Sequence, residues 1–88
     1  MEIIYSPKAV EDIAFWKKSG QKLLQKKIQH LIEDIQEHPH SGIGKPEQLK
    51  HSLTGCWSRH INDEHRIIYE VVQNSIHIHS LKDHYLKK

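Results

Sequence analysis

The second half of the chain carries side chains that suit acid–base chemistry on a phosphodiester. They include a carboxylate, two histidines, three cations and a tyrosine: Glu47, His60, His84, Lys50, Arg59, Arg66 and Tyr85. To cleave RNA without a metal, a base takes the proton from a ribose 2′-hydroxyl, which then attacks the neighbouring phosphate. An acid protonates the departing 5′-oxygen, and cations stabilise the charge that builds on the phosphate oxygens. This set of residue types can supply all three roles.

The same residues also have ordinary structural interpretations. Glu47 can be a solvated carboxylate in a turn, Arg66 a cross-strand ion-pair partner, and His84 a histidine in a terminal tail. Because these residue types are common, composition alone favours the ordinary interpretation for each residue taken singly. The alternation of residues 66–72 does not settle which of their two faces is solvated.

Other kinds of site have less support in the sequence. His77 and His79 would project from one face of a strand and could hold zinc, but no cysteine pair or His-Glu-x-x-His motif accompanies them, so we expect no metal ligands and no cofactor. Residues 42–45 (Gly-Ile-Gly-Lys) have the wrong spacing for a phosphate-binding loop. Cys56 follows Gly55 in a strand-like segment, where a small buried side chain is more usual than a nucleophile.

A basic segment without acidic residues lies between residues 17 and 27. Its five lysines are Lys17, Lys18, Lys22, Lys26 and Lys27. Lys18, Lys22 and Lys26 are four residues apart, which predicts that they share one helical face. A solvated helix surface is the commoner meaning of such a row, and a ridge that contacts nucleic-acid phosphates is the functional one.

Hydrophobic spacing in the first half predicts a strand and two helices. Residues 2–5 suit a strand, and Ser6 followed by Pro7 is a typical helix start. In the first helix, one face would hold Val10, Ile13, Ala14 and Trp16. Ser19-Gly20 breaks this helix. The second helix ends at Pro39, and its apolar residues recur at three- and four-residue spacing: Leu24, Ile28, Leu31, Ile32 and Ile35.

After a loop at residues 38–46, the period changes from 3.6 to 2. Trp57, Arg59 and Ile61 alternate with Ser58 and His60, and residues 67–72 and 76–79 are also strand-like, with turns at 62–64 and 73–75. The prediction is a single α+β domain over residues 1–88 with the order β-α-α-β-β-β. Two N-terminal helices would pack on one face of a mainly antiparallel, four-stranded sheet.

Composition limits the setting in which this domain works. The chain has 88 residues and a formal charge of +2, but nine histidines allow it to become more positive next to an anion. The single cysteine excludes an internal disulfide. The first residues lack the features of a signal peptide, and no apolar run is long enough to span a bilayer, so we expect a cytoplasmic protein without a membrane partner.

Residues 44–69 provide the most specific signal. Their sequence, GKPEQLKHSLTGCWSRHINDEHRIIY, resembles the signature of the YoeB/Txe family, roughly G-K-P-E-x-L-K-x-x-L-x-G-x-W-S-R-R-I-x-x-E-H-R-L-V-Y. The similarity is ungapped. The ending His84-Tyr85 and the opening Ile3-Ile4-Tyr5-Ser6 also resemble this family of toxins, which belongs to the RelE superfamily.

The resemblance implies a RelE-like, microbial RNase-like fold and ribosome-dependent cleavage of mRNA in the ribosomal A site. It gives Glu47 the role of general base and His84 that of general acid, with Arg66 stabilising the phosphate and Tyr85 orienting the substrate. Lys50, Arg59 and His60 would bind substrate. It also implies a YefM/Axe-like antitoxin and binding of operator DNA only as a toxin–antitoxin complex, and it leaves open whether the toxin forms a homodimer.

Two departures from the family pattern affect these expectations. His60 stands where the family commonly has a second arginine, which predicts cleavage that is weaker, more pH-sensitive, or supported by another cation. Residues 86–88 extend past Tyr85 and add two lysines. A rival hypothesis is a protein that stalls translation by occupying the decoding site without cutting the message.

Overall fold

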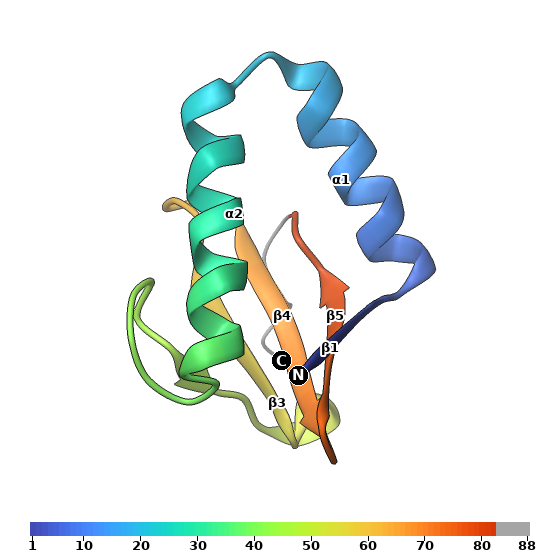
Figure 1. Cartoon of the computed structure of the whole chain (residues 1–88), viewed down its shortest axis with the longest axis vertical. Helices are drawn as coiled ribbons and strands as arrows, with labels where there is room; N and C mark the ends of the chain where they lie inside the picture. Colours follow the sequence, from blue (N-terminus) through green and yellow to red (C-terminus); the bar gives the residue numbers. More distant parts are fainter. Residues whose placement is uncertain (83–88) are drawn as a thin grey trace.

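The computed structural model describes residues 1–82, and residues 83–88 lie outside the described part of the chain (Figure 1). The elements follow in the order β1 (Glu2–Tyr5), α1 (Pro7–Ser19), α2 (Lys22–Glu37), β2 (Glu47–Gln48), a short 3-10 helix η1 (His51–Leu53), β3 (Cys56–His60), β4 (Arg66–Val72) and β5 (Ser75–Ser80). The predicted α+β class is confirmed. None of the helices in residues 1–82 has the length and apolar character needed to cross a membrane.

The sheet has five strands in the order β1-β5-β4-β3-β2. β1 is parallel to β5, and the other neighbours are antiparallel. The predicted number of four strands was wrong, because no strand was predicted at residues 47–48. β2 has only two residues, both exposed, so no hydrophobic alternation marks it, and its pairing of Glu47 with Ser58 on β3 defines it instead.

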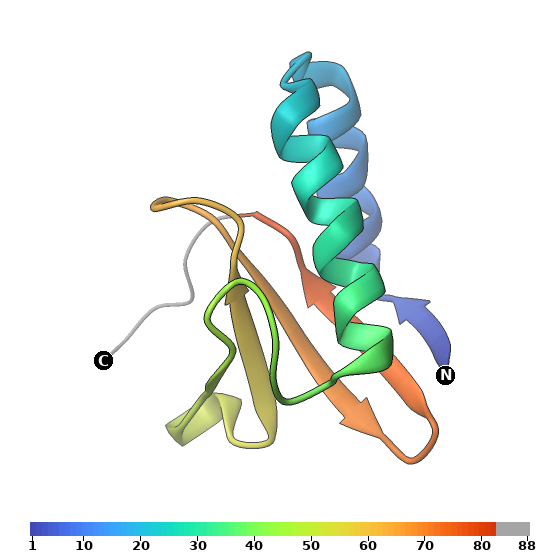
Figure 2. The same ribbon diagram turned by 60° about the vertical axis from the view of Figure 1, so that its left-hand side comes forward.

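Both helices lie on the same side of the sheet (Figures 1 and 2). The Ser6 hydroxyl accepts the Ala9 amide at 3.0 Å and caps α1, and Gly20 ends the helix in a left-handed conformation with φ 74°. The predicted apolar face of α2 is confirmed, with Ile28, Leu31 and Ile35 buried.

The predicted inner face of α1 was only partly correct. Val10 is 56% exposed, whereas Trp16 and Asp12 are buried. The segment after β5 explains this orientation, because the Asp12 carboxylate accepts the Leu81 amide at 2.8 Å and the Trp16 indole donates to the Leu81 carbonyl at 2.7 Å. The spacing of apolar residues could not predict that a carboxylate, Asp12, is buried on this face of α1.

The predicted row of lysines on one helical face does not form. α1 ends at Ser19 and α2 begins at Lys22, so Lys18 and Lys22 belong to different helices. The lysines are exposed around the α1–α2 turn, at the end of the helices that projects beyond the sheet (Figure 2).

The main core lies between the helices and the sheet. It joins Leu31 and Ile35 of α2 to Ile67 and Tyr69 of β4 and to Ile78 of β5. Since side chains alternate along a strand, Ser58, His60, Arg66, Ile68, Glu70 and His79 point to the opposite side. We call this side, which neither α-helix covers, the helix-free face. A small second cluster, made of Leu49, Cys56 and Ile68 with Leu53 packed against it, lies there.

Candidate functional site

Strand pairing brings three of the predicted site residues to one end of the helix-free face. On β3, Ser58 pairs with Glu47 of β2, and His60 pairs with Arg66 of β4. Directly paired residues of antiparallel strands project from the same face. Glu47, His60 and Arg66 therefore project together from three adjacent strands.

The charges around His60 confirm that these side chains are close neighbours. Burial lowers the pKa of His60 below its ordinary value of 6.5, and the positive charges of Arg66 and Lys45 lower it further. The carboxylates of Glu47 and Asp63 act in the opposite direction but do not outweigh these effects. His60 is therefore a neutral imidazole at neutral pH, close enough to carboxylates and to cations for both to affect its pKa.

The turn between β3 and β4 holds the Arg66 side chain. The Asn62 carboxamide oxygen accepts the amides of Glu64 at 2.9 Å and of His65 at 2.7 Å, which fixes the turn. Arg66 Nη1 donates to the carbonyls of Asn62 at 3.0 Å, Asp63 at 3.2 Å and His65 at 3.2 Å. Every hydrogen bond recorded for Arg66 within residues 1–82 uses Nη1. Nε and Nη2 of Arg66 make none in that part of the chain.

The segment that carries Glu47 is attached to β3 by its backbone. The His60 amide donates to the Gly44 carbonyl at 2.7 Å. Gly44 has φ 82°, and a Cβ there would lie 2.6 Å from Leu31 Cδ2. This close approach requires glycine, and it fixes the start of the strand that presents Glu47.

Lys50 lies exposed at the start of η1, three residues after Glu47. The register of β2 on β3 carries Lys50 past Cys56, toward the end of β3 opposite His60, and within residues 1–82 its side chain makes no contact with Glu47, His60 or Arg66. His84 and Tyr85, the predicted acid and substrate-orienting residue, lie outside the described residues.

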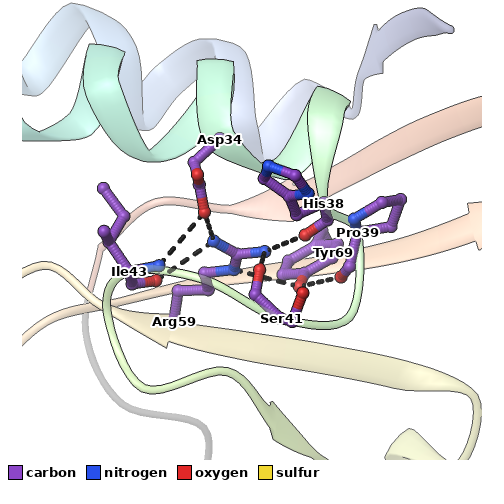
Figure 3. A network of polar contacts seen from close by, with 7 residues as sticks. All are labelled: Asp34, His38, Pro39, Ser41, Ile43, Arg59 and Tyr69. Atoms are coloured by element: carbon purple, nitrogen blue, oxygen red, sulfur yellow. Dashed lines mark hydrogen bonds and ion pairs between the residues drawn. The ribbon is translucent and has the colours of Figure 1, made fainter.

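Arg59 lies on the other face of β3, away from Glu47, His60 and Arg66. Its side chain is fully buried between the sheet and α2 (Figure 3). It donates to the Asp34 carboxylate at 2.5 Å and to the carbonyls of Ile43 at 3.1 Å and Ser41 at 2.8 Å. It also donates to the His38 carbonyl and to the Tyr69 hydroxyl at 3.2 Å. We therefore correct its predicted role from substrate binding to holding the 38–43 segment in place.

Two residues that were not predicted also belong to this region. Ser58 is fully buried, and its hydroxyl has no hydrogen-bond partner among residues 1–82. It projects from β3 between Glu47 and Ile68. Lys45 contributes positive charge at His60. The alternation along β3 already placed Ser58 on the same face as His60, but nothing in the sequence indicated a functional role for it.

The described residues contain a group with metal-binding chemistry, but it differs from the pair of histidines considered above. Ligand atoms of Cys56, Glu70 and His79 lie within 4.8 Å of one another, and His77 is not part of the group. Burial and the Glu70 charge raise the pKa of the Cys56 thiol, so at neutral pH it is protonated and a poor nucleophile.

The strand register thus places a carboxylate, an imidazole and a guanidinium on one face of the sheet. Comparison with known proteins gives the family. The family of YoeB-like toxins of bacterial type II toxin–antitoxin systems matches residues 5–85. Toxin YoeB of Escherichia coli (strain K12) is 41% identical over 85 residues, which are 97% of this chain and 100% of that protein.

Other relatives agree. Toxin RelK of Mycobacterium tuberculosis (strain H37Rv) is 42% identical over 92% of this chain and 94% of its own. The YoeB–YefM toxin–antitoxin complex from Staphylococcus aureus contains a chain with 45% identity and a TM-score of 0.86, over 97% of this chain and 98% of that one. The YoeB/ParE toxin from Agrobacterium tumefaciens has 32% identity and a TM-score of 0.92, over 97% and 100%. This chain therefore belongs to the YoeB-like toxins of bacterial type II toxin–antitoxin systems.

Proposed function

We propose that this toxin is a ribosome-dependent endoribonuclease that cleaves mRNA in the ribosomal A site and thereby inhibits translation. The observation that carries the proposal is the grouping of Glu47, His60 and Arg66 at one end of the helix-free face. A carboxylate and a guanidinium that flank one imidazole can bind a single nucleotide from two sides.

In the proposed reaction, Glu47 accepts the proton of the ribose 2′-hydroxyl. The 2′-oxygen attacks the adjacent phosphorus, the bond to the 5′-oxygen breaks, and His84 gives that oxygen a proton. Arg66 and Lys50 stabilise the charge on the phosphorane, and Tyr85 orients the substrate. The products are a 2′,3′-cyclic phosphate, which can open to a 3′-phosphate, and a 5′-hydroxyl. The nucleophile belongs to the substrate, so the reaction needs no cofactor.

His60 weakens the cationic character of the site relative to the arginine that the family commonly has there. Because its pKa lies below 6.5, it carries no charge at neutral pH. We assign to it hydrogen bonding to the substrate rather than charge neutralisation. Arg66 then supplies most of the fixed positive charge on this face, since its guanidinium remains protonated at any physiological pH.

The partners follow from the relatives. The Staphylococcus aureus YoeB forms a heterotetrameric complex with YefM, and a YoeB dimer from the same organism is also known. We propose that this toxin likewise binds a YefM-like antitoxin, which inactivates it, that it binds operator DNA only in that complex, and that the free toxin forms a homodimer.

Mapping of RNA ends in a purified translation mixture tests the nuclease proposal. Ribosomes programmed with a defined message are incubated with the purified chain or with its His84→Ala variant. The proposal predicts cuts within the A-site codon, with cyclic or 3′-phosphate ends, that depend on ribosomes and are strongly reduced by the substitution. An intact message on stalled ribosomes would instead support the rival, a stalling protein that does not cut.

A further inference from the structure

Three potential metal ligands come together on the helix-free face, at the end of β3 opposite His60 and Arg66. Cys56 on β3, Glu70 on β4 and His79 on β5 each offer one ligand atom, and these atoms all lie within 4.8 Å of one another. Nε2 of His79 is already 3.2 Å from a carboxylate oxygen of Glu70. No two of these residues are close in sequence, so the fold alone assembles the group.

The sheet register explains why the group forms. Cys56 and Glu70 are directly paired across β3 and β4, so their side chains leave the same face. On β5, Ile76 and Ile78 are buried in the main core, which directs the alternate residues His77 and His79 to the helix-free face. Of these two histidines, His79 is the one within reach of both other ligands.

We infer that Cys56, Glu70 and His79 form a binding site for a zinc ion. A sulfur, an imidazole nitrogen and a carboxylate oxygen are the three ligand types that zinc takes in proteins, and three protein ligands leave the fourth tetrahedral position to water. Sulfur and nitrogen bound to one zinc ion lie about 3.5 Å apart, so the ligand atoms need to close by roughly 1 Å. Glu70 and His79 are both partly exposed, which leaves them free to make this adjustment.

Binding changes the protonation of the group. The Cys56 thiol loses its proton to solvent and becomes a thiolate ligand, and the contact between Glu70 and His79 is replaced by bonds from each to the metal. Because Cys56 packs in the small cluster with Leu49 and Ile68, the sulfur side of the site is shielded from water. Glu70 and His79 form the side through which the ion enters.

The site lies on the same face as the proposed catalytic residues. It is at the opposite end of β3 from His60 and Arg66, while Glu47 pairs with Ser58, two residues from Cys56. Cys56 and His60 occupy the two ends of β3, four residues or about 13 Å apart. A bound ion would link the three central strands β3, β4 and β5. None of its three ligands is a residue of the proposed cleavage reaction.

A titration with Co²⁺, a spectroscopic substitute for Zn²⁺, tests the site on the purified full-length chain. A cobalt–thiolate bond gives an intense charge-transfer band, and Cys56 is the only cysteine in the chain, so the band reports on this site alone. The wild-type protein should show a saturable band at one ion per chain that Zn²⁺ abolishes by displacement. Cys56→Ala should show no band.

A matched pair of histidine variants provides the control. Loss of an outer-shell partner already reduces metal affinity about 10–100-fold, so His79→Ala should weaken Co²⁺ binding at least about 10-fold. His77→Ala, on the same face of the same strand, should bind as the wild type does. Zn²⁺ should raise the Tm of the wild type and of His77→Ala but not that of His79→Ala.

Melting curves in metal-free buffer establish that the variants fold before they are compared. The inference is overturned if the wild type gives no thiolate band, if His77→Ala weakens binding as much as His79→Ala does, or if Zn²⁺ stabilises all three proteins equally. None of these readouts depends on RNA cleavage, so the result stands apart from the proposed nuclease activity.

Discussion

Arg59 and Asp34 form an ion pair across the interface between the sheet and α2, with Nη1 2.5 Å from the carboxylate oxygen. The guanidinium is fully buried and the carboxylate is 20% exposed. The same carboxylate accepts the Ile43 amide at 3.1 Å. Asp34 of α2 therefore contacts both β3, through Arg59, and the loop that connects α2 to β2 (Figure 3). This loop leads into the segment that presents Glu47, which makes the ion pair a remote support of the candidate site.

Asp34→Asn should destabilise the protein by about 1–3 kcal/mol, because it leaves a buried guanidinium without its counter-charge while several carbonyls still accept from it. Urea unfolding at pH 7 measures the change. Asp63→Asn, at an exposed position of the β3–β4 turn, is the matched control and should change stability by less than about 0.5 kcal/mol. Equal effects of the two substitutions would contradict the assigned role.

The same pair predicts a pH dependence of stability. The hydrogen bond and the charge interaction between Asp34 and Arg59 hold the pKa of Asp34 below its ordinary value of 3.8. The carboxylate therefore contributes stability above that value, and this contribution is lost as the pH falls through the lower pKa of the folded state. Between pH 4 and pH 2, the wild type should lose more stability than Asp34→Asn does. Parallel curves for the two proteins would disprove the linkage.

The lowered pKa of His60 predicts how the stability of the protein changes closer to neutral pH. Its pKa in the folded protein is below 6.5, so the unfolded chain takes up a proton first as the pH falls. Stability should therefore decline as the pH decreases through 6.5, and His60→Gln should flatten this part of the curve. His30→Gln, at an exposed position on α2, should show the same pH dependence of stability as the wild type. Denaturant unfolding at several pH values between 5 and 8 provides the comparison.

The neutral state of His60 also predicts a gain of function. His60→Arg places a permanent charge beside the substrate phosphate, where a charge-assisted hydrogen bond is worth about 1.5–3 kcal/mol. Cleavage on ribosomes at pH 7.5 should become about 10-fold faster or more. His60→Gln, which keeps a neutral hydrogen-bonding group, should react at a rate close to that of the wild type. A slower His60→Arg variant that still folds would show that this position does not face the substrate.

Gly44→Ala should disturb both stability and activity. The new Cβ would lie 2.6 Å from Cδ2 of the fully buried Leu31 and would also require a left-handed backbone. Gly20→Ala isolates the backbone effect, because Gly20 has φ 74° and nothing lies within 4 Å of the position that a methyl group would take there. We expect a loss of about 1–2 kcal/mol at Gly20 and about 1–3 kcal/mol more at Gly44, measured by urea unfolding. Equal losses would mean that the contact with Leu31 is unimportant.

The sequence predicted the elements that are marked by a regular spacing of apolar residues. It missed the features that depend on a single contact between residues far apart in the chain. The spacing of Leu24, Ile28 and Leu31 was enough to define α2, because a helix needs a continuous apolar stripe. β2 was missed because pairing with β3, rather than its own residues, makes it a strand. The buried Asp12 was missed because its partner, the Leu81 amide, lies 69 residues away in the chain.

Prediction of the site had the same limit. The family resemblance selected Glu47 and Arg66, and the strand register brings them to the same face. The alternation in residues 57–61 already put Arg59 and His60 on opposite faces, so substrate contact by both was inconsistent with a flat strand. The resemblance gave Arg59 a role in substrate binding, and its burial was unexpected because an arginine inside a core is rare. The carboxylate of Asp34 together with four carbonyl and hydroxyl groups makes that burial stable.

The most direct test of the account is the single-turnover rate of mRNA cleavage on programmed ribosomes for the wild type, Glu47→Ala and Glu64→Ala. Glu64 is an exposed carboxylate in the β3–β4 turn and serves as the matched control. If Glu47 is the general base, its loss should slow cleavage about 10²–10⁴-fold, whereas Glu64→Ala should cut at the wild-type rate. A Glu47→Ala protein that folds and cleaves as fast as the control would contradict the central claim.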